Sequence, residues 1–187
     1  YNKLGLQHIT TDAQNFTTTK TYNGYGDLYS TIRKINSGSN STAYHYYDLL
    51  GRQTQTSSHG VISQTRYDAF GRVSGVRDGN GNWTNTTYKF GGREVVVSDA
   101  ANKTNITTYD AFGRTLTSKD AQGAITTYQY DEKQNAVTVT TPSGTSITSW
   151  SNADGDTLQL RDGNGYVTYY NYNKDGQLES VKDHNRN

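Results

Sequence analysis

The chain has 187 residues with 18 basic and 17 acidic side chains, a formal net charge of +1, and only 31% hydrophobic residues. This balance gives no clustered positive field for nucleic acid, and no run of roughly 18 apolar residues predicts a membrane span. The absence of cysteine excludes disulfide bonds and thiol chemistry, whereas 16 tyrosines and abundant threonine are typical of β-strands.

A repeat of about 21 residues organises the chain. Each unit opens on a tyrosine that is followed four residues later by a glycine; Ser151 replaces the tyrosine in one unit and Gln134 the glycine in another. A second signal lies about eleven residues into most units, where an aspartate precedes Gly or Asn by three residues, and the last of these, Asp183, precedes Arg186. Two turn signals predict two short elements per unit. We expect nine units and no separate domain, with the units starting at residues 1, 22, 47, 67, 88, 109, 130, 151 and 172.

In chain order, two early units depart from the regular spacing. The unit from Tyr22 is four residues longer, and its surplus falls in residues 35–42, a Ser/Asn/Gly-rich stretch that predicts a lengthened exposed loop. The unit from Tyr47 is one residue short, which predicts a tighter turn around residues 57–60. We therefore expect length changes to fall in loops and to leave the strand register intact.

The segments between the turns are short and rich in Thr and β-branched residues, and no window keeps an apolar 3.6-residue period long enough for a helix. The sequence predicts an all-β fold of tandem hairpins that extend one antiparallel strip, with the unit-starting tyrosines in one column. The clearest expected strands are residues 82–88, 94–98, 125–130, 136–140 and 157–161.

One motif, Tyr67-Asp68-Ala69-Phe70-Gly71-Arg72, returns unchanged at residues 109–114. Its Asp is expected to accept backbone N–H groups at the start of a type I turn, and its Gly to supply the positive φ that closes a bulged hairpin loop. The Arg occurs in only four units, so the turn does not require it, and we interpret it as marking units that pair or pack differently. The signature positions are Tyr47, Asp48, Gly51, Arg52, Tyr67, Asp68, Gly71, Arg72, Tyr88, Gly92, Arg93, Tyr109, Asp110, Gly113 and Arg114.

The motif Tyr-Asp-x-x-Gly-Arg at this spacing resembles the YD or RHS repeat, with full matches at 47–52, 67–72 and 109–114 and a near match at 88–93. The resemblance implies a long β-strip that winds as a spiral into a hollow shell, as in bacterial RHS polymorphic toxins, the cocoon of Tc-type toxin complexes and teneurins. For a bacterial protein it implies secretion or cell-surface display. The implied partners are neighbouring repeats and an enclosed C-terminal toxin segment, released by an aspartyl-protease-like core region. Neither that core motif nor a toxin domain is evident in the sequence.

The residue types that carry catalysis or bind metals give no matching pattern. The four histidines, His8, His45, His59 and His184, have no ligand spacing. The stretch from Asp78 begins like a calcium loop, but Trp83 and Lys89 stand where that loop needs Gly and Glu. A turn carboxylate bonded to backbone N–H groups is expected to have a lowered pKa, the opposite of a general acid. We predict no enzymatic activity, no metal and no cofactor.

Two functions from different classes remain open. The first is a structural one, in which the repeats build the wall of a toxin-enclosing or surface-displayed shell. The second is a binding module that contacts glycans or a surface protein through aromatic and polar side chains, with Trp83 and Tyr169 as candidate contacts. Cross-strand aromatic pairs that stabilise the sheet, by roughly 0.2–1 kcal/mol each, explain the same aromatics without a ligand. In either case, unpaired strands at the two ends favour self-association of the isolated chain.

Overall fold

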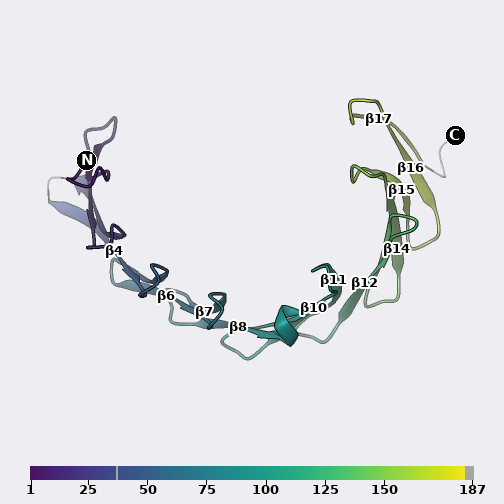
Figure 1. Ribbon diagram of the computed structural model, residues 1–187, viewed down its shortest axis with the longest axis horizontal. Coiled ribbons are helices and arrows are strands. Elements are labelled where there is room, and N and C mark those ends of the chain that lie inside the picture. Colours follow the sequence, from purple (N-terminus) through teal and green to yellow (C-terminus); the bar gives the residue numbers. More distant parts are fainter. Residues whose placement is uncertain (37, 184–187) are drawn as a thin grey trace. The chain divides into compact units, whose positions relative to one another are not determined.

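A computed structural model of the chain describes residues 1–36 and 38–183 (Figure 1). In this part of the chain, seventeen strands belong to one antiparallel sheet, and a single 3-10 turn is the only helical element. No helix in these ranges is long and apolar enough to cross a membrane. Two residues named above, His184 and Arg186, lie outside the described residues. The prediction of an all-β antiparallel strip is confirmed.

The chain divides into two compact units, of which the first comprises residues 1–86 and 98–102. Each of its strands pairs antiparallel with the next one along the chain. The strands are β1 (Ile9–Thr11), β2 (Thr17–Tyr22), β3 (Leu28–Asn36), β4 (Ser39–Tyr47), β5 (Gln53–Ser58), β6 (Val61–Tyr67), β7 (Val73–Arg77) and β8 (Trp83–Lys89), whose last residues belong to the second unit.

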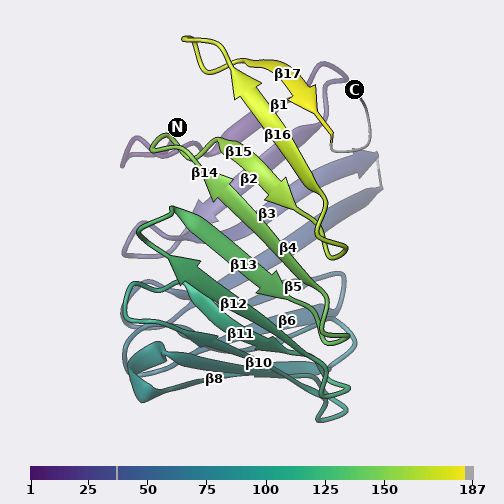
Figure 2. The same ribbon diagram turned by 90° about the vertical axis from the view of Figure 1, so that its right-hand side faces the viewer.

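The second unit comprises residues 87–97 and the chain from Lys103 onward. Figure 2 shows β12 to β17, in green and yellow, side by side in chain order. The elements are η1 (Phe90–Gly92), β9 (Glu94–Ser98), β10 (Thr104–Tyr109), β11 (Thr115–Lys119), β12 (Ile125–Asp131), β13 (Ala136–Thr140), β14 (Ser146–Ser151), β15 (Thr157–Arg161), β16 (Val167–Tyr172) and β17 (Leu178–Lys182). Strands β9, β13 and β15 have the predicted bounds, β8 is shifted by one residue at both ends, and β12 is one residue longer than predicted.

The loop predicted at residues 35–42 is wrong. Strands β3 and β4 have nine residues each, and their pairing continues to Asn36 opposite Ser39. Ser37 lies outside the described residues. The surplus residues therefore lengthen two paired strands, because a ladder joins backbone groups and accepts Ser, Asn and Thr side chains on an exposed surface.

The tight turn predicted around residues 57–60 is confirmed. Strand β5 ends at Ser58 and β6 begins at Val61. The two residues between them, His59 and Gly60, both have positive φ, at 51° and 79°. This is the geometry of a two-residue type I′ hairpin turn, which matches the twist of the strands that it joins.

The sheet is a single layer without an apolar core. Among the described residues, only Ser30, Gly75 and Ala136 are buried. The expectation that neither face forms a dry core is thus met. Because little apolar burial is available to stabilise such a layer, the contacts between neighbouring hairpins become the main source of order.

Candidate functional site

The Tyr-Asp-x-x-Gly-Arg motif forms one defined turn. In the copy at 67–72, Oδ1 of Asp68 accepts the backbone N–H groups of Phe70 and Arg72, each at 2.9 Å. The backbone N–H of Gly71 donates to the carbonyl of Asp68 at 3.0 Å, and Gly71 has φ of 82°. The ladder shifts register beside the turn, between Arg66 and Tyr67. The predicted bulged type I turn is confirmed, and the equivalent glycines Gly51 and Gly113 have φ of 74° and 81°.

The arginine of the motif binds the other carboxylate oxygen of the same aspartate. Nε and one terminal nitrogen of Arg72 both lie 2.7 Å from Oδ2 of Asp68. Two further turns repeat this ion pair with distances of 2.6–2.8 Å, at Asp48–Arg52 and Asp110–Arg114. Each turn carboxylate is therefore fully engaged, with one oxygen on the backbone and one on the guanidinium.

These bonds hold the turn carboxylates in the ionised form. The pKa of Asp48 is lowered from its ordinary value of 3.8, chiefly because the Arg52 side chain donates to it. At Asp68 and Asp110, desolvation alone would raise the pKa, but the backbone N–H and guanidinium donors outweigh it, so the pKa is lowered there too. A lowered pKa was the expectation for these groups, and it does not suit a general acid.

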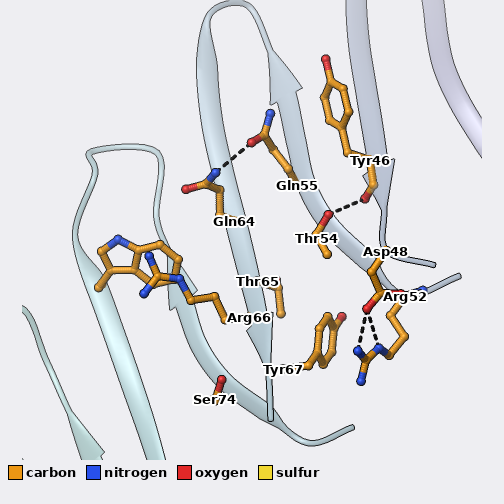
Figure 3. A pocket seen from close by; sticks show the side chains of 11 residues that line it. Tyr46, Asp48, Arg52, Thr54, Gln55, Gln64, Thr65, Arg66, Tyr67 and Ser74 are labelled. Atoms are coloured by element: carbon orange, nitrogen blue, oxygen red, sulfur yellow. Dashed lines mark hydrogen bonds and ion pairs between the residues drawn. The ribbon is translucent and has the colours of Figure 1, made fainter. Parts of the chain in front are cut away.

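The same arginine also contacts the tyrosine that opens the following unit. The guanidinium of Arg52 lies 4.4 Å from the ring centroid of Tyr67, and the three side chains Asp48, Arg52 and Tyr67 are seen together in Figure 3. The Tyr67 hydroxyl donates to the carbonyl oxygen of Gln53 at 2.9 Å. Tyr67 is thus held at its ring face and at its hydroxyl by the turn of the preceding unit.

The hydrogen bond from the tyrosine hydroxyl recurs along the chain, and its acceptor holds the same position in each unit. In every case the tyrosine donates to the carbonyl of the residue six places after the start of the preceding unit. Besides Tyr67, the pairs are Tyr22 to Gln7 (2.6 Å), Tyr47 to Leu28 (3.0 Å), Tyr130 to Thr115 (2.8 Å) and Tyr172 to Thr157 (3.1 Å). These five tyrosines therefore link their hairpins to the hairpin before.

Turns without arginine reverse the polarity of the same contact. Asn23 donates from Nδ2 to Oδ2 of Asp27 at 2.9 Å, while its Oδ1 accepts the backbone N–H groups of Tyr25 and Asp27. The exchange recurs at Asn152–Asp156 (3.0 Å) and Asn173–Gln177 (3.1 Å). In the three full matches an acidic first residue is thus paired with arginine four residues on, and in these three turns an amide first residue is paired with an acceptor. The turn from Asn2 differs, because Leu6 stands at the paired position. This correlation between two turn positions is readable in the sequence and was missed.

A cavity of about 630 Å³ lies beside these links in the first unit (Figure 3). Across its floor, the Gln64 amide donates to Oε1 of Gln55 at 2.8 Å. The guanidinium of Arg66 lies 3.7 Å from the Trp83 ring, and that ring also rests against the backbone of Gly75. The lining residues are Tyr46, Asp48, Arg52, Thr54, Gln55, Gln64, Thr65, Arg66, Tyr67, Ser74 and Trp83.

Comparisons with known proteins identify the repeat. Residues 109–146 match the family model described as RHS Repeat. Residues 109–146 are therefore similar to an RHS repeat. Searching the curated proteins by sequence gives no match.

Two solved structures share the fold of this chain. The TcdB2-TccC3-Cdc42 structure has a TM-score of 0.57 at 14% identity, over 95% of this chain and 12% of that chain. The structure of TcdB2-TccC3 without its hypervariable C-terminal region has a TM-score of 0.57 at 15% identity, over 96% of this chain and 12% of that one. At such identities the likeness shows the fold, and this chain spans about an eighth of the length of the proteins it resembles.

Two units build the turn differently. In the near match from Tyr88, Lys89 replaces the aspartate and forms an ion pair with Glu94 at 2.9 Å. Phe90, Gly91 and Gly92 then all take positive φ, and the backbone N–H of Arg93 donates to the carbonyl of Phe90 at 3.3 Å. In the unit from Tyr130, the left-handed residue is Asn135, with φ of 48°, and not Gln134, which the spacing had put in the place of the glycine.

The candidate ligand-contacting aromatics occupy separate surroundings in the strip. Trp83 lies in the cavity of the first unit, where Arg66 already covers its ring. Tyr169 is 46% exposed on β16 of the second unit, opposite Gln159 and Lys182. Ring-to-ring contacts are found instead at Tyr29, whose ring lies 5.9 Å from that of Tyr44 and 6.3 Å from that of Tyr46.

The histidines lie apart from one another in the strip. Nδ1 of His8 lies 2.7 Å from the carbonyl oxygen of Lys20, and His59 forms the tight turn after β5. His45 lies in β4. In residues 1–36 and 38–183, no three His, Cys, Asp or Glu side chains are grouped in a way that would hold a metal ion.

Proposed function

We propose that this chain is a wall segment of a toxin-enclosing shell in a larger protein. The observation that carries the proposal is the series of tyrosine links, which joins five hairpins to their predecessors in a layer that lacks an apolar core. A layer held by nearest-neighbour contacts grows by adding units and needs no second layer to be stable. Such a construction suits a thin, extended wall.

The likeness to TcdB2-TccC3 supports the same assignment. One of the similar structures was solved without a hypervariable C-terminal region, so that protein carries such a region. We propose that the protein containing this chain likewise encloses a C-terminal toxin segment, with neighbouring repeats as the direct partners of this segment. Such a protein would be secreted or displayed on a bacterial cell surface.

Catalysis is not part of the proposal. The carboxylates of Asp48, Asp68 and Asp110 are bonded to backbone N–H groups and arginine, and their pKa is lowered. A carboxyl group that is ionised and fully bonded neither donates a proton nor attacks a substrate readily. The recurring aspartates are therefore assigned to the scaffold.

Protease protection in the full-length parent protein tests the wall function. The C-terminal segment should resist digestion in the intact protein and become sensitive when Tyr47→Phe, Tyr67→Phe and Tyr130→Phe together remove three links. A segment digested as quickly in the intact protein as when it is expressed alone would contradict the proposal. Circular dichroism on the triple variant distinguishes opening of the wall from global unfolding.

A second candidate function is glycan or surface-protein binding at the cavity of the first unit, favoured by its mixture of amide, arginine and aromatic side chains. A glycan array probed with the chain tests it, and Trp83→Ala should abolish binding. Trp150→Ala is the matched control, because Trp150 also lies beneath an arginine, at 4.9 Å from Arg161. Equal binding by the two folded variants would remove the cavity as the site.

A further inference from the structure

Large apolar side chains stand at the tips of the Tyr-Asp turns. In the first unit, Leu4, Tyr25, Leu50 and Phe70 are 70–91% exposed, and each is the residue before the glycine of its turn. Leu49, next to Leu50, is fully exposed. Because strands pair in chain order, these turns lie along one edge of the sheet, which we call the tyrosine-turn edge. Two strand spacings, or roughly 9.5 Å, separate successive tips.

The turn itself does not require an apolar tip. Asp154 and Asp175 hold the same position in two later turns and donate the same backbone bond, at 3.0 Å, to Asn152 and Asn173. Phe70 makes that bond to Asp68 at 2.9 Å. Since a charged residue fits the same backbone, the exposed phenylalanine and leucine side chains serve something other than folding.

The opposite edge of the sheet provides an internal comparison. Its turns have the same bulged backbone, as at Asp78–Gly81, where Oδ1 of Asp78 accepts the N–H of Asn80 at 2.9 Å. The tips there are small or polar: Gln14, Asn80, Ala101, Gln122, Ser143 and Asn164. Apolar tips are therefore a property of one edge and not of the turn type.

Hollows separate the apolar tips. A cavity of about 350 Å³ lies between the turns at 23–27 and 48–51, with Tyr25 and Leu49 at its rim and Tyr29 and Tyr47 among its walls. A hollow of about 400 Å³ lies in the second unit between Gly92 and the turn at 110–113. In each unit, a hollow thus lies beside a turn of this edge.

We propose that the tyrosine-turn edge is an interface on which the same edge of a second copy of this chain docks. An edge with a fixed period fits another edge of the same period, so that the tips of one copy enter the hollows of the other. An antiparallel, two-fold arrangement satisfies this for both copies at once. This inference does not rest on the proposed wall function.

The area available is that of a modest interface. Two aromatic and three leucine tips in the first unit offer on the order of 600 Å² per copy, somewhat below the roughly 800 Å² per partner of a standard complex. The second unit carries two further exposed tips, Phe90 and Phe112. We therefore expect reversible dimerisation at micromolar concentrations.

Sedimentation analysis of the 187-residue chain over a range of concentrations tests the proposal. Leu50→Asp with Phe70→Asp should weaken dimerisation by about a hundredfold, since two central apolar contacts are lost. The turn accepts aspartate at this position, because Asp154 and Asp175 occupy it in two later units. Gln14→Asp with Asn80→Asp, which adds equal charge to the opposite edge, should leave the dissociation constant within about twofold.

Single cysteines locate the contact, because the chain has none of its own. Phe70→Cys should form a disulfide-linked dimer rapidly under mild oxidation, whereas Asn80→Cys should not. Val181→Cys, on the terminal strand β17, reports pairing through strand ends. A chain that stays monomeric at all concentrations, or one that cross-links fastest through Val181→Cys, would overturn the proposal.

Discussion

The turns at the two edges of the strip, such as Asp68–Gly71 and Asp78–Gly81, share one backbone but differ in what surrounds it. In both, the aspartate Oδ1 accepts two backbone N–H groups, and the glycine has φ of 82° or 92°. Only the first edge adds an arginine from within the same turn, the tyrosine link and an apolar tip. The comparison separates what a turn needs from what the strip needs: Asp and Gly make the turn, and Arg and Tyr join the units.

The largest expected loss of stability comes from replacing the positive-φ glycine, which the turns at both edges share. Gly71→Val should lower the free energy of unfolding by about 2 kcal/mol, because a β-branched residue is strained at positive φ. Gly81→Val, on the opposite edge, should cost a similar amount. Urea denaturation of the two variants checks this, and a loss confined to Gly71→Val would mean that the two turns are not equivalent. Gly113→Val should behave as Gly71→Val does.

The next effect belongs to the tyrosine edge alone. Tyr67→Phe keeps the ring beneath Arg52 but removes the hydroxyl bond to Gln53, so it should cost about 1 kcal/mol. Tyr25→Phe is the control, since Tyr25 is an exposed turn tip and should be neutral. Thermal melting of both variants measures the difference. Equal melting temperatures would show that the link contributes nothing.

A smaller effect tests the two polarities of the turn contact. Arg52→Asp should destabilise the chain by roughly 0.5–1 kcal/mol, since it places two carboxylates together and removes the stacking on Tyr67. Adding Asp48→Asn recreates the arrangement of Asn23 and Asp27 and should recover part of the loss, leaving only the stacking unrestored. A double-mutant cycle from denaturation curves provides the coupling energy. A coupling energy of zero would refute the idea that the first residue of the turn and the residue four positions later act as a pair.

The smallest effect is on the pH dependence of stability. The pKa of Asp48, Asp68 and Asp110 is lowered from 3.8 in the folded chain. These carboxylates therefore stabilise the fold when the pH is above their pKa in the unfolded chain. The stabilisation is lost as the pH falls through their lower pKa in the folded chain. Melting temperature measured between about pH 6 and pH 2 should drop below pH 4, and a variant with Asn at all three positions should drop less.

Local chemistry made much of this fold predictable from the sequence. The strand at 94–98 and the bulged turn at Asp68–Gly71 follow from β-branched residues and from Asp and Gly at fixed offsets. The segment at 35–42 misled, because Ser and Asn also occupy exposed strands when the backbone finds a partner. A composition rich in Ser and Asn therefore predicts a loop only where the backbone has no neighbouring strand to pair with.

The links between units were harder to predict, because they join residues far apart in the sequence. Nothing near Tyr67 indicates that its hydroxyl reaches Gln53, fourteen positions earlier. A usable signal existed for the arginine, since it stands four residues after the aspartate in all three full matches. Asp or Gln stands there instead where the first residue is Asn23, Asn152 or Asn173. Reading the two positions together would have assigned its role.

The tyrosine links also give the strip a direction. Each hydroxyl reaches back to the preceding unit, so a hairpin carries its own anchor and needs only an already folded predecessor. Growth from the N-terminus towards the C-terminus leaves no tyrosine waiting for its acceptor, whereas growth in the opposite sense does. Removing residues 1–8 leaves the Tyr22 hydroxyl without its acceptor, the carbonyl of Gln7. Removing the last hairpin takes away its tyrosine and leaves every earlier tyrosine with its acceptor. Truncation from the N-terminus should therefore lower the melting temperature more than an equal truncation from the C-terminus.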